Sequence, residues 1–440
     1  MGPGLAIFGL GAALLGSVTA DAAAGARLEL MGGAAPLQPG EPTKASIATA
    51  LTPLAALRLS EPSWDLVCRY WPRLYLREPN PSADGRLLLL HQASIGNRVD
   101  LSPTVTWQSS LQGTAGSYDY TVYALSATPD AALRSGPKGQ PGVVQPGGLQ
   151  PPTMGGAGQP TLPPQQAGVP PANLPLSVLS IYDVSFDTSF ALRTSARTSL
   201  DLGGVLGDSG SLNSGSSLYP HHQRAVFEPS FAYALSPVDD VKVPAAVEYH
   251  AIETTHLFAG SAQVDLTHRF SVLTKMRAGI GGVFFERVDP AAGAQVRPSG
   301  LLGITQAFAH LRELRIDGAL DVIYQPLLYV QIAQYRPTLT LQAGVDAVLS
   351  PRWKAGARVS MSTTATAHPY VPGEIETFFI ADAPVVYQAT PSLAFELGAR
   401  TLWNAQHFSE SLAPENVQVW AYGAVTVLFA TTEDPGQVTR

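Results

Sequence analysis

Charged side chains recur at every second or fourth position in several segments, and this spacing is where chemistry could arise. Residues i, i+2 and i+4 of an extended chain point to the same face, so such a row forms a ladder along one side of a strand. Ladders of both signs favour a hydrated, moderately selective passage, because rings of charge set ion preference. An equally good interpretation is that they hydrate and brace a wall through ion pairs. The rows are Arg69, Arg73 and Arg77; Asp183 and Asp187; Asp317 and Asp321; and the mixed set Lys354, Arg358, Glu396 and Arg400.

The sequence offers no clear catalytic or metal-binding group. A hydrolase needs a nucleophile beside a base and a residue that orients the base, but the nine histidines are scattered without a local link to Ser or Asp. His221 and His222 are adjacent, and adjacent side chains point apart on an extended chain. Cys68 is the single cysteine, which excludes a disulfide framework and a multi-thiolate metal site. We therefore predict no catalytic residues, no metal and no cofactor.

Composition excludes several other classes of protein. Only 14% of the 440 residues are charged, against about 25% in a typical globular domain. The net charge of −7 disfavours a nucleic-acid partner, because nucleic-acid binders are normally basic. Beyond the N-terminus no apolar run reaches the ~20 residues of a membrane-spanning helix, which excludes a multispan helical protein.

Apolar residues alternate with polar ones along most of the chain. In Trp64–Arg77, for example, the row Trp64, Leu66, Cys68, Tyr70, Leu74, Leu76 faces away from the row Asp65, Val67, Arg69, Trp71, Arg73, Tyr75, Arg77. A period of two indicates strands and not helices. The rows run about 10–14 residues, close to the 9–11 that a tilted strand needs to cross hydrocarbon and longer than the 5–6 of soluble sheets. The pattern predicts an all-β protein.

The connections between rows alternate between short and long. Several short ones share the pattern Leu-Ser-Pro, as in Leu235-Ser236-Pro237 and Leu349-Ser350-Pro351, and proline suits a tight turn at a strand end. Longer, Gly/Pro/Asn-rich connections lie between them, including Glu78–Arg86, Asp208–His222, Arg287–Ser299 and Gln325–Pro337. This asymmetry is typical of outer-membrane barrels.

About seventeen rows follow Ile47, and Arg27–Met31 can supply one more, for an even total near eighteen. The expected fold is a single transmembrane antiparallel β-barrel of 16–18 strands, with short periplasmic turns, long extracellular loops and an aqueous lumen.

Four parts of the chain are distinguished. Residues 1–20 are expected to be a signal peptide, because an apolar core is followed by Val18-Thr19-Ala20, although the usual basic start is missing. Residues 27–430 form the barrel, and residues 431–440 a C-terminal tail. Residues 126–175 contain twelve of the 37 prolines and are interpreted as a disordered loop inserted in the barrel. The alternative is two β domains joined by a Pro-rich linker.

The last row carries a resemblance to known proteins. Val417, Val419, Ala421, Gly423, Val425, Val427 and Phe429 form an uninterrupted apolar row that ends in an aromatic residue. It resembles the C-terminal signal of bacterial outer-membrane β-barrel (porin-like) proteins, although here the tail Ala430–Arg440 follows it. The resemblance implies a cell outer-membrane location, contact with outer-membrane lipid, recognition of the Phe429 strand by the barrel assembly machinery, and a channel for hydrophilic molecules without enzymatic activity.

A looser resemblance is to the large barrels associated with polysaccharide export. It implies an exit port for a secreted polymer and a periplasmic polymer-export component as partner. Aromatic residues in the inward rows suit stacking on sugar rings, or equally bracing of the wall; they are Trp71, Tyr75, Trp420 and Tyr422. Two alternatives stay open: a structural or adhesive surface barrel without transport, and a barrel hydrolase with a Ser/His pair at the rim.

Overall fold

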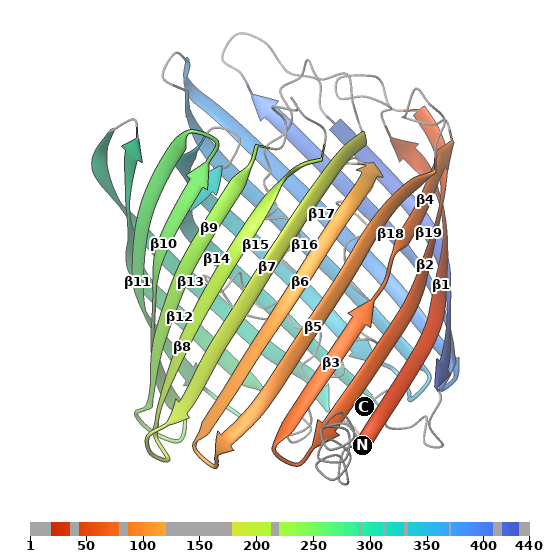
Figure 1. Ribbon diagram of the computed structural model, residues 1–440, viewed down its shortest axis with the longest axis horizontal. Helices are drawn as coiled ribbons and strands as arrows, with labels where there is room; N and C mark the ends of the chain where they lie inside the picture. The colour runs from red at the N-terminus through yellow and green to blue at the C-terminus, as the bar shows by residue number, and fades with distance from the viewer. Residues whose placement is uncertain are drawn as a thin grey trace, which may run out of the picture.

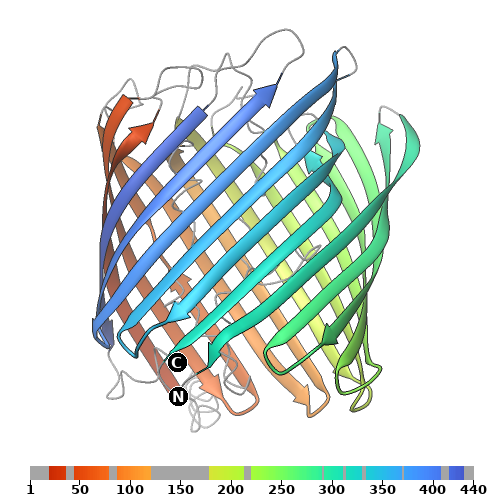
Figure 2. The same cartoon turned by 180° about the vertical axis from the view of Figure 1, so that it is seen from behind.

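The computed structural model describes residues 19–35, 44–78, 87–119, 178–212, 220–289, 292–310, 314–329, 333–368, 371–407 and 416–430. These residues form nineteen strands in one antiparallel sheet that closes on itself (Figures 1 and 2). The strands are β1 (Thr19–Ala35), β2 (Lys44–Glu61), β3 (Trp64–Tyr70), β4 (Arg73–Glu78), β5 (Leu88–Ser102), β6 (Val105–Asp119), β7 (Val178–Arg193), β8 (Thr198–Ser211), β9 (His222–Ala234), β10 (Asp239–Ile252), β11 (Thr255–Arg269), β12 (Thr274–Asp289), β13 (Ala292–His310), β14 (Arg315–Tyr329), β15 (Gln334–Val348), β16 (Trp353–His368), β17 (Val371–Thr390), β18 (Leu393–His407) and β19 (Asn416–Ala430). A helix long and apolar enough to cross a membrane is not found within these ranges.

The sheet has eighteen strand positions, because β3 and β4 occupy one of the nineteen jointly. Both pair with β2 on one side and β5 on the other, and the interruption between them falls at Trp71-Pro72. Proline has no N–H for the ladder, so a break in pairing is expected there. The described residues thus confirm the all-β barrel of 16–18 strands.

The barrel closes where the first strand meets the last. β1 pairs with β19 from Ala23↔Ala430 to Ala34↔Val419 and with β2 on its other edge. The predicted strand at Arg27–Met31 is confirmed, and β1 begins earlier than expected, at Thr19. Closure leaves no strand edge, so backbone N–H and C=O groups pair within the sheet, as a bilayer demands.

The inner face of the barrel is identified by contacts between distant strands. Arg77 on β4 and Trp420 on β19 are separated by β1 and β2, yet the Arg77 guanidinium carbon lies 5.6 Å from the centre of the Trp420 ring. Three strand spacings amount to about 14 Å, so the two side chains can meet only on the concave side. Register partners share a face, and the predicted charged rows therefore point inward.

The opposite rows carry large apolar side chains that are exposed on the outer surface. Leu30 on β1 is 58% exposed and Ile280 on β12 is 75% exposed. The C-terminal row ending at Phe429 belongs to the same face. An apolar outside around a polar inside is the arrangement of a transmembrane β-barrel.

The turns at the lower end of Figure 1 are short, and Ser or Thr hydroxyls accept backbone N–H groups in several of them. The described turns there contain two to four residues. In the β9–β10 turn the Ser236 hydroxyl accepts the N–H groups of Val238 and Asp239 at 3.1 and 3.0 Å, and Ser350 accepts that of Trp353 at 3.2 Å. The Leu-Ser-Pro pattern therefore marks tight turns in which a hydroxyl replaces a backbone acceptor.

Two of the predicted long connections are shorter than expected. The segment Arg287–Ser299 is largely strand, because β12 continues to Asp289 and β13 starts at Ala292. The segment Gln325–Pro337 lies mostly in β14 and β15. Backbone pairing extends these hairpins through residues of any type. The glycine and proline content of the two segments therefore predicted connections that are too long.

Several predictions concern residues outside the described ranges. Residues 1–18, residues 120–177, which contain the expected loop at 126–175, and the tail 431–440 are not described. The strands on either side of the long segment are adjacent, since β6 and β7 pair directly from Val105↔Leu192 to Asp119↔Val178.

Candidate functional site

A network of charged residues occupies the inner wall at the closure between β1 and β19. The Arg400 guanidinium, 4% exposed, donates to Glu29 Oε1 at 2.7 Å and to Asp382 Oδ1 at 3.0 Å. Its central carbon lies 3.9 Å from the centre of the Tyr422 ring. One cation is therefore held by two carboxylates and an aromatic face.

The network continues across β19. Arg27 on β1 donates to Glu396 Oε2 on β18 at 2.9 Å, and the Tyr422 hydroxyl donates to Glu396 Oε1 at 2.8 Å. Arg73 lies 3.9 Å from Glu29 Oε2. Three guanidinium groups thus face three carboxylates, and the local charge is balanced. These predicted residues brace the closure of the wall.

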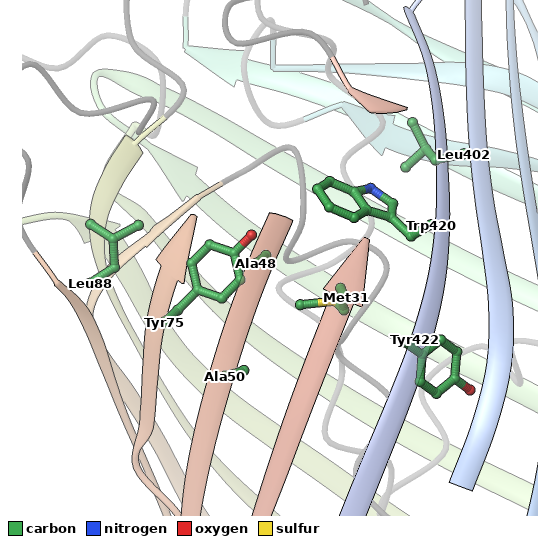
Figure 3. Packing of buried hydrophobic residues seen from close by; sticks show 8 residues of the cluster. All are labelled: Met31, Ala48, Ala50, Tyr75, Leu88, Leu402, Trp420 and Tyr422. Carbon is green, nitrogen blue, oxygen red and sulfur yellow. The ribbon is translucent and has the colours of Figure 1, made fainter. Parts of the chain in front are cut away.

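An apolar cluster on the same inner wall (Figure 3) contacts Arg77, another member of the basic row. Arg77 is buried, stacks on Trp420 and donates to the Ser46 hydroxyl at 3.3 Å. Trp420 is 0% exposed, and Tyr75 and Tyr422 are also buried. The cluster is formed by Met31, Ala48, Ala50, Tyr75, Leu88, Leu402, Trp420 and Tyr422. These aromatic faces are therefore occupied by neighbouring side chains.

Arg69 differs from the other two arginines of its row. Within the described part of the chain it makes no ion pair, and it lines a recess of about 240 Å³ in the inner wall. The recess lies over β3, β5, β6 and β7, and Asp187 is another of its charged groups. Between Arg69 and Asp187 the surface is formed by hydroxyls and amides, among them Ser94, Ser110, Gln108 and Gln112.

The acidic rows, like the basic row, contain both residues with an ion pair and residues without one among the described residues. Asp187 accepts a hydrogen bond from Ser110 at 3.4 Å, and neither it nor Asp183 forms an ion pair among the described residues. Asp317 pairs with Arg315, and Asp321 lies 3.9 Å from Arg277. Unpaired acids therefore lie on β7 and paired ones on β14.

The last two predicted residues lie on β16. Arg358 pairs with Asp346 Oδ1 at 3.0 Å, whereas Lys354 is exposed near the end with the short turns. The structure thus places the eleven predicted residues on inner rows, groups Arg73, Glu396 and Arg400 in one network, and leaves Arg69 apart from them.

The sequence interpretation missed Glu29 and Asp382, which complete the network. A signal was present for Glu29, because Arg27, Glu29 and Met31 form an inward row at period two. Asp382 is identified only by the sheet register, in which it faces Arg400 and Arg358. Their partners could not be assigned without the strand order.

A second inward cluster, also missed, lies near the end of the barrel opposite the short turns. His222 Nε2 lies 3.0 Å from His250 Nδ1, and His250 Nε2 lies 2.9 Å from Glu248 Oε2. Tyr335 on β15 donates to the same Glu248 oxygen at 3.2 Å. His221 instead contacts Asp208 at 3.1 Å, so the adjacent histidines point apart as predicted.

None of the described histidine rings forms a hydrogen bond to a serine hydroxyl. In the part of the chain that the structure describes, their ring nitrogens contact Asp239, Asp208, Glu248, Tyr70, Tyr249 or another histidine. Groups of three or more potential metal ligands are likewise absent from these ranges. The side chains of His310, His368 and His407 lie outside the description.

The closed eighteen-position sheet, its apolar outer rows and its charged interior define a class: the chain has the fold of porin-like outer-membrane β-barrels, with an outer surface suited to contact with membrane lipid. Known protein families and curated proteins give no match. Several solved structures of Pseudomonas aeruginosa are similar in fold. The outer-membrane protein OpdK is 10% identical, with a TM-score of 0.45 over 94% of this chain and 99% of that one.

Two further similar structures come from the same organism. OccK2 (OpdF), solved in complex with glucuronate, is 9% identical, with a TM-score of 0.45 over 94% of this chain and 98% of that one. OpdO is 11% identical, with a TM-score of 0.41 over 94% and 98% of the two chains.

Proposed function

We propose that this barrel is a passive channel for small hydrophilic solutes across the outer membrane. The observation that carries the proposal is the recess bearing Arg69 and Asp187 on the inner wall. Charges neutralised by neighbours have little field left for a passing solute, whereas these two have no ion-pair partner among the described residues. An unpaired cation and anion separated by hydroxyl and amide groups can exchange hydrogen bonds with polar solutes of either charge.

The width of the barrel supports the same function. Barrels of about eight strands are filled by their own side chains, whereas those of 16–18 strands leave an aqueous channel. The eighteen strand positions of this sheet match the second group and support an aqueous passage.

Conductance measures this function directly. The purified barrel in planar lipid bilayers should give discrete current steps in KCl, and liposomes that contain it should swell in isotonic solutions of small sugars or amino acids. Liposomes with the heat-unfolded protein are the control. A folded, heat-modifiable barrel that stays silent in both assays would exclude a channel.

Export of a polysaccharide is the narrower form of this hypothesis, with a periplasmic polymer-export component as partner. It calls for accessible aromatic faces in the lumen, and Tyr75, Trp420 and Tyr422 are buried, so they support bracing of the wall instead. Trp71 is partly exposed. A surface role without transport predicts a silent barrel, and the liposome assay therefore separates it from a channel. Recognition of the Phe429 strand by the assembly machinery stays a prediction.

A further inference from the structure

The recess on the inner wall is lined by four charged side chains, and two of them already have a partner. Asp65 on β3 accepts two hydrogen bonds from the Arg58 guanidinium, at 2.8 and 2.7 Å. Arg98 on β5 donates to Asp100 Oδ1 from two of its nitrogens, each at 3.2 Å. Among the described residues, the charges without an ion pair in the recess are therefore one guanidinium on β3 and one carboxylate on β7.

These two charges, Arg69 and Asp187, lie on the first and the last of the four strands that line the recess. The strands are three positions apart, so their backbones are separated by about 14 Å. Both side chains extend into the recess from its edges, but they form no ion pair with each other. A solute that touches both charges must therefore be several bonds long.

The floor between the two charges is polar and has open room. Ser94, Ser110 and Gln112 present hydroxyl and amide groups there. Gly96 on β5 has no side chain, and a Cβ at this position would lie 3.9 Å from Ser109 O and Ser110 Cβ, which is an ordinary van der Waals contact. The floor can thus donate and accept hydrogen bonds along a solute that spans it.

Beyond Asp187 the inner wall is acidic. Asp183 on β7 and Glu228 on β9 form no ion pair among the described residues. Arg224 on β9 faces the same carboxylates and offsets part of their charge. Because three carboxylates face one guanidinium, the β7 edge favours a positive group, whereas Arg69 favours a negative group at the β3 edge.

We propose that the recess binds short zwitterionic peptides during passage, with the peptide carboxylate on Arg69 and the peptide ammonium on Asp187. The inference rests on the proposed channel function and names its substrate class. Hydrogen bonds between charged groups are about twice as strong as neutral ones. An extended chain spans about 3.3–3.6 Å per residue, so a tripeptide of about 10 Å reaches across the gap that the two side chains leave, and a single amino acid does not.

Block of the KCl current in single-channel recordings at pH 7 tests the site with four matched solutes. Triglycine carries both end charges, N-acetyl-triglycine only the carboxylate, and triglycine amide only the ammonium. Glycine carries both charges one carbon apart. Triglycine should block at a concentration about tenfold below that of the other three, because it makes one more charged contact. Equal block by triglycine and glycine would overturn the spanning of the recess.

Two variants test the two ends of the peptide separately. Arg69→Ser should weaken the block by triglycine and by N-acetyl-triglycine about tenfold and leave the block by triglycine amide unchanged. Asp187→Asn should weaken the block by triglycine and by triglycine amide and spare N-acetyl-triglycine. A general field in the lumen would instead change the block by every charged solute. Unchanged block by triglycine in both variants overturns the binding site.

A third variant fills the floor. Gly96→Leu should abolish the preference for triglycine and leave discrete KCl steps. Gly113→Leu is the matched control, because Gly113 lies on the outer row of β6, where an added Cβ meets no atom within 4 Å. Heat-modifiable mobility verifies folding of each variant. A conducting wild-type barrel that none of the solutes blocks overturns the peptide site and leaves the channel function intact. A silent wild-type barrel overturns the channel function and this inference with it.

Discussion

Three arginines spaced four residues apart on one inner row have three different environments. Arg73 lies near Glu29, Arg77 is buried on Trp420, and Arg69 faces an open recess. A charge that already has a partner contributes little to the field that a solute meets, because the opposite charge nearby cancels most of it at a distance. The basic row therefore acts as a brace at two positions, and at the third the cation has no ion-pair partner among the described residues.

This difference predicts which arginine sets ion preference. Replacing Arg69, Arg73 and Arg77 together with Ser should lower anion preference, and Arg69→Ser alone should produce most of the shift. A unit charge 4 Å away contributes about 1 kcal/mol in water, so a several-fold change in permeability ratio is expected. Reversal potentials in a KCl gradient measure it, with Arg352→Ser in the exposed β15–β16 turn as control. An unchanged ratio in the triple variant would refute the role of this row in the lumen.

Asp187 lines the same recess as Arg69 and carries the opposite charge, so its removal should change ion preference in the opposite direction. Asp187→Asn removes a carboxylate without an ion-pair partner among the described residues and should shift the same reversal potential toward anions. Asp317→Asn, whose carboxylate is paired with Arg315, should shift it less. Equal shifts in the two variants would mean that pairing does not decide which charges a solute meets.

At the scale of elements, the closure of the barrel is stabilised by charges as well as by the ladder between β1 and β19. Arg27–Glu396 and Arg400–Glu29 both join β1 to β18 across β19. The strands that close the barrel come from opposite ends of the chain, so their encounter is the least local step of folding. Ion pairs that require the correct register favour one closure over its slipped alternatives.

Arg400→Met should test this role. It leaves Glu29 and Asp382 buried without their shared cation, and breaking a buried ion pair costs about 3–5 kcal/mol. Urea unfolding in lipid vesicles should show a loss of that order. The control Arg193→Met, at the exposed end of β7, should change stability by less than about 0.5 kcal/mol. Adding Glu29→Gln to Arg400→Met should recover part of the loss, and equal unfolding of Arg400→Met and Arg193→Met would contradict the bracing role.

At the scale of the whole molecule, one closed sheet replaces a hydrophobic core. The apolar side chains face outward and the charged ones inward, and the ladder supplies every strand with two neighbours. Such a wall depends on the pairing of each adjacent pair of strands and not on the length of the connection between them. Long insertions are therefore tolerated where two paired strands are close at one end.

Deletion of residues 126–175 follows from this architecture. Because β6 and β7 pair directly up to Asp119↔Val178, a short Gly/Ser linker in place of the segment should leave the heat-modifiable electrophoretic mobility unchanged. Deleting an equal share of a strand pair, such as β11 and β12, is the control that should abolish it. Loss of folding in the first variant would favour the interpretation of two domains.

The sequence alone determined the strand class, the two faces and the approximate number of strands. Alternation depends on local geometry, and a period of two is visible in any segment such as Trp64–Arg77. It also determined which charges face the interior, because face follows from parity. Connection lengths were less well determined, as β12–β13 and β14–β15 show, because pairing extends a hairpin beyond the residues that favour strands.

Only the tertiary structure decided which of those charges have partners. Arg27 and Glu396 lie 369 residues apart in the chain, and Tyr335 reaches Glu248 across five strand positions. Such pairs follow from the closure, curvature and register of the sheet, which are properties of all the strands together. A local pattern carries no record of them, so residue type and spacing could not distinguish Arg69, which has no ion-pair partner among the described residues, from Arg400, which braces the closure.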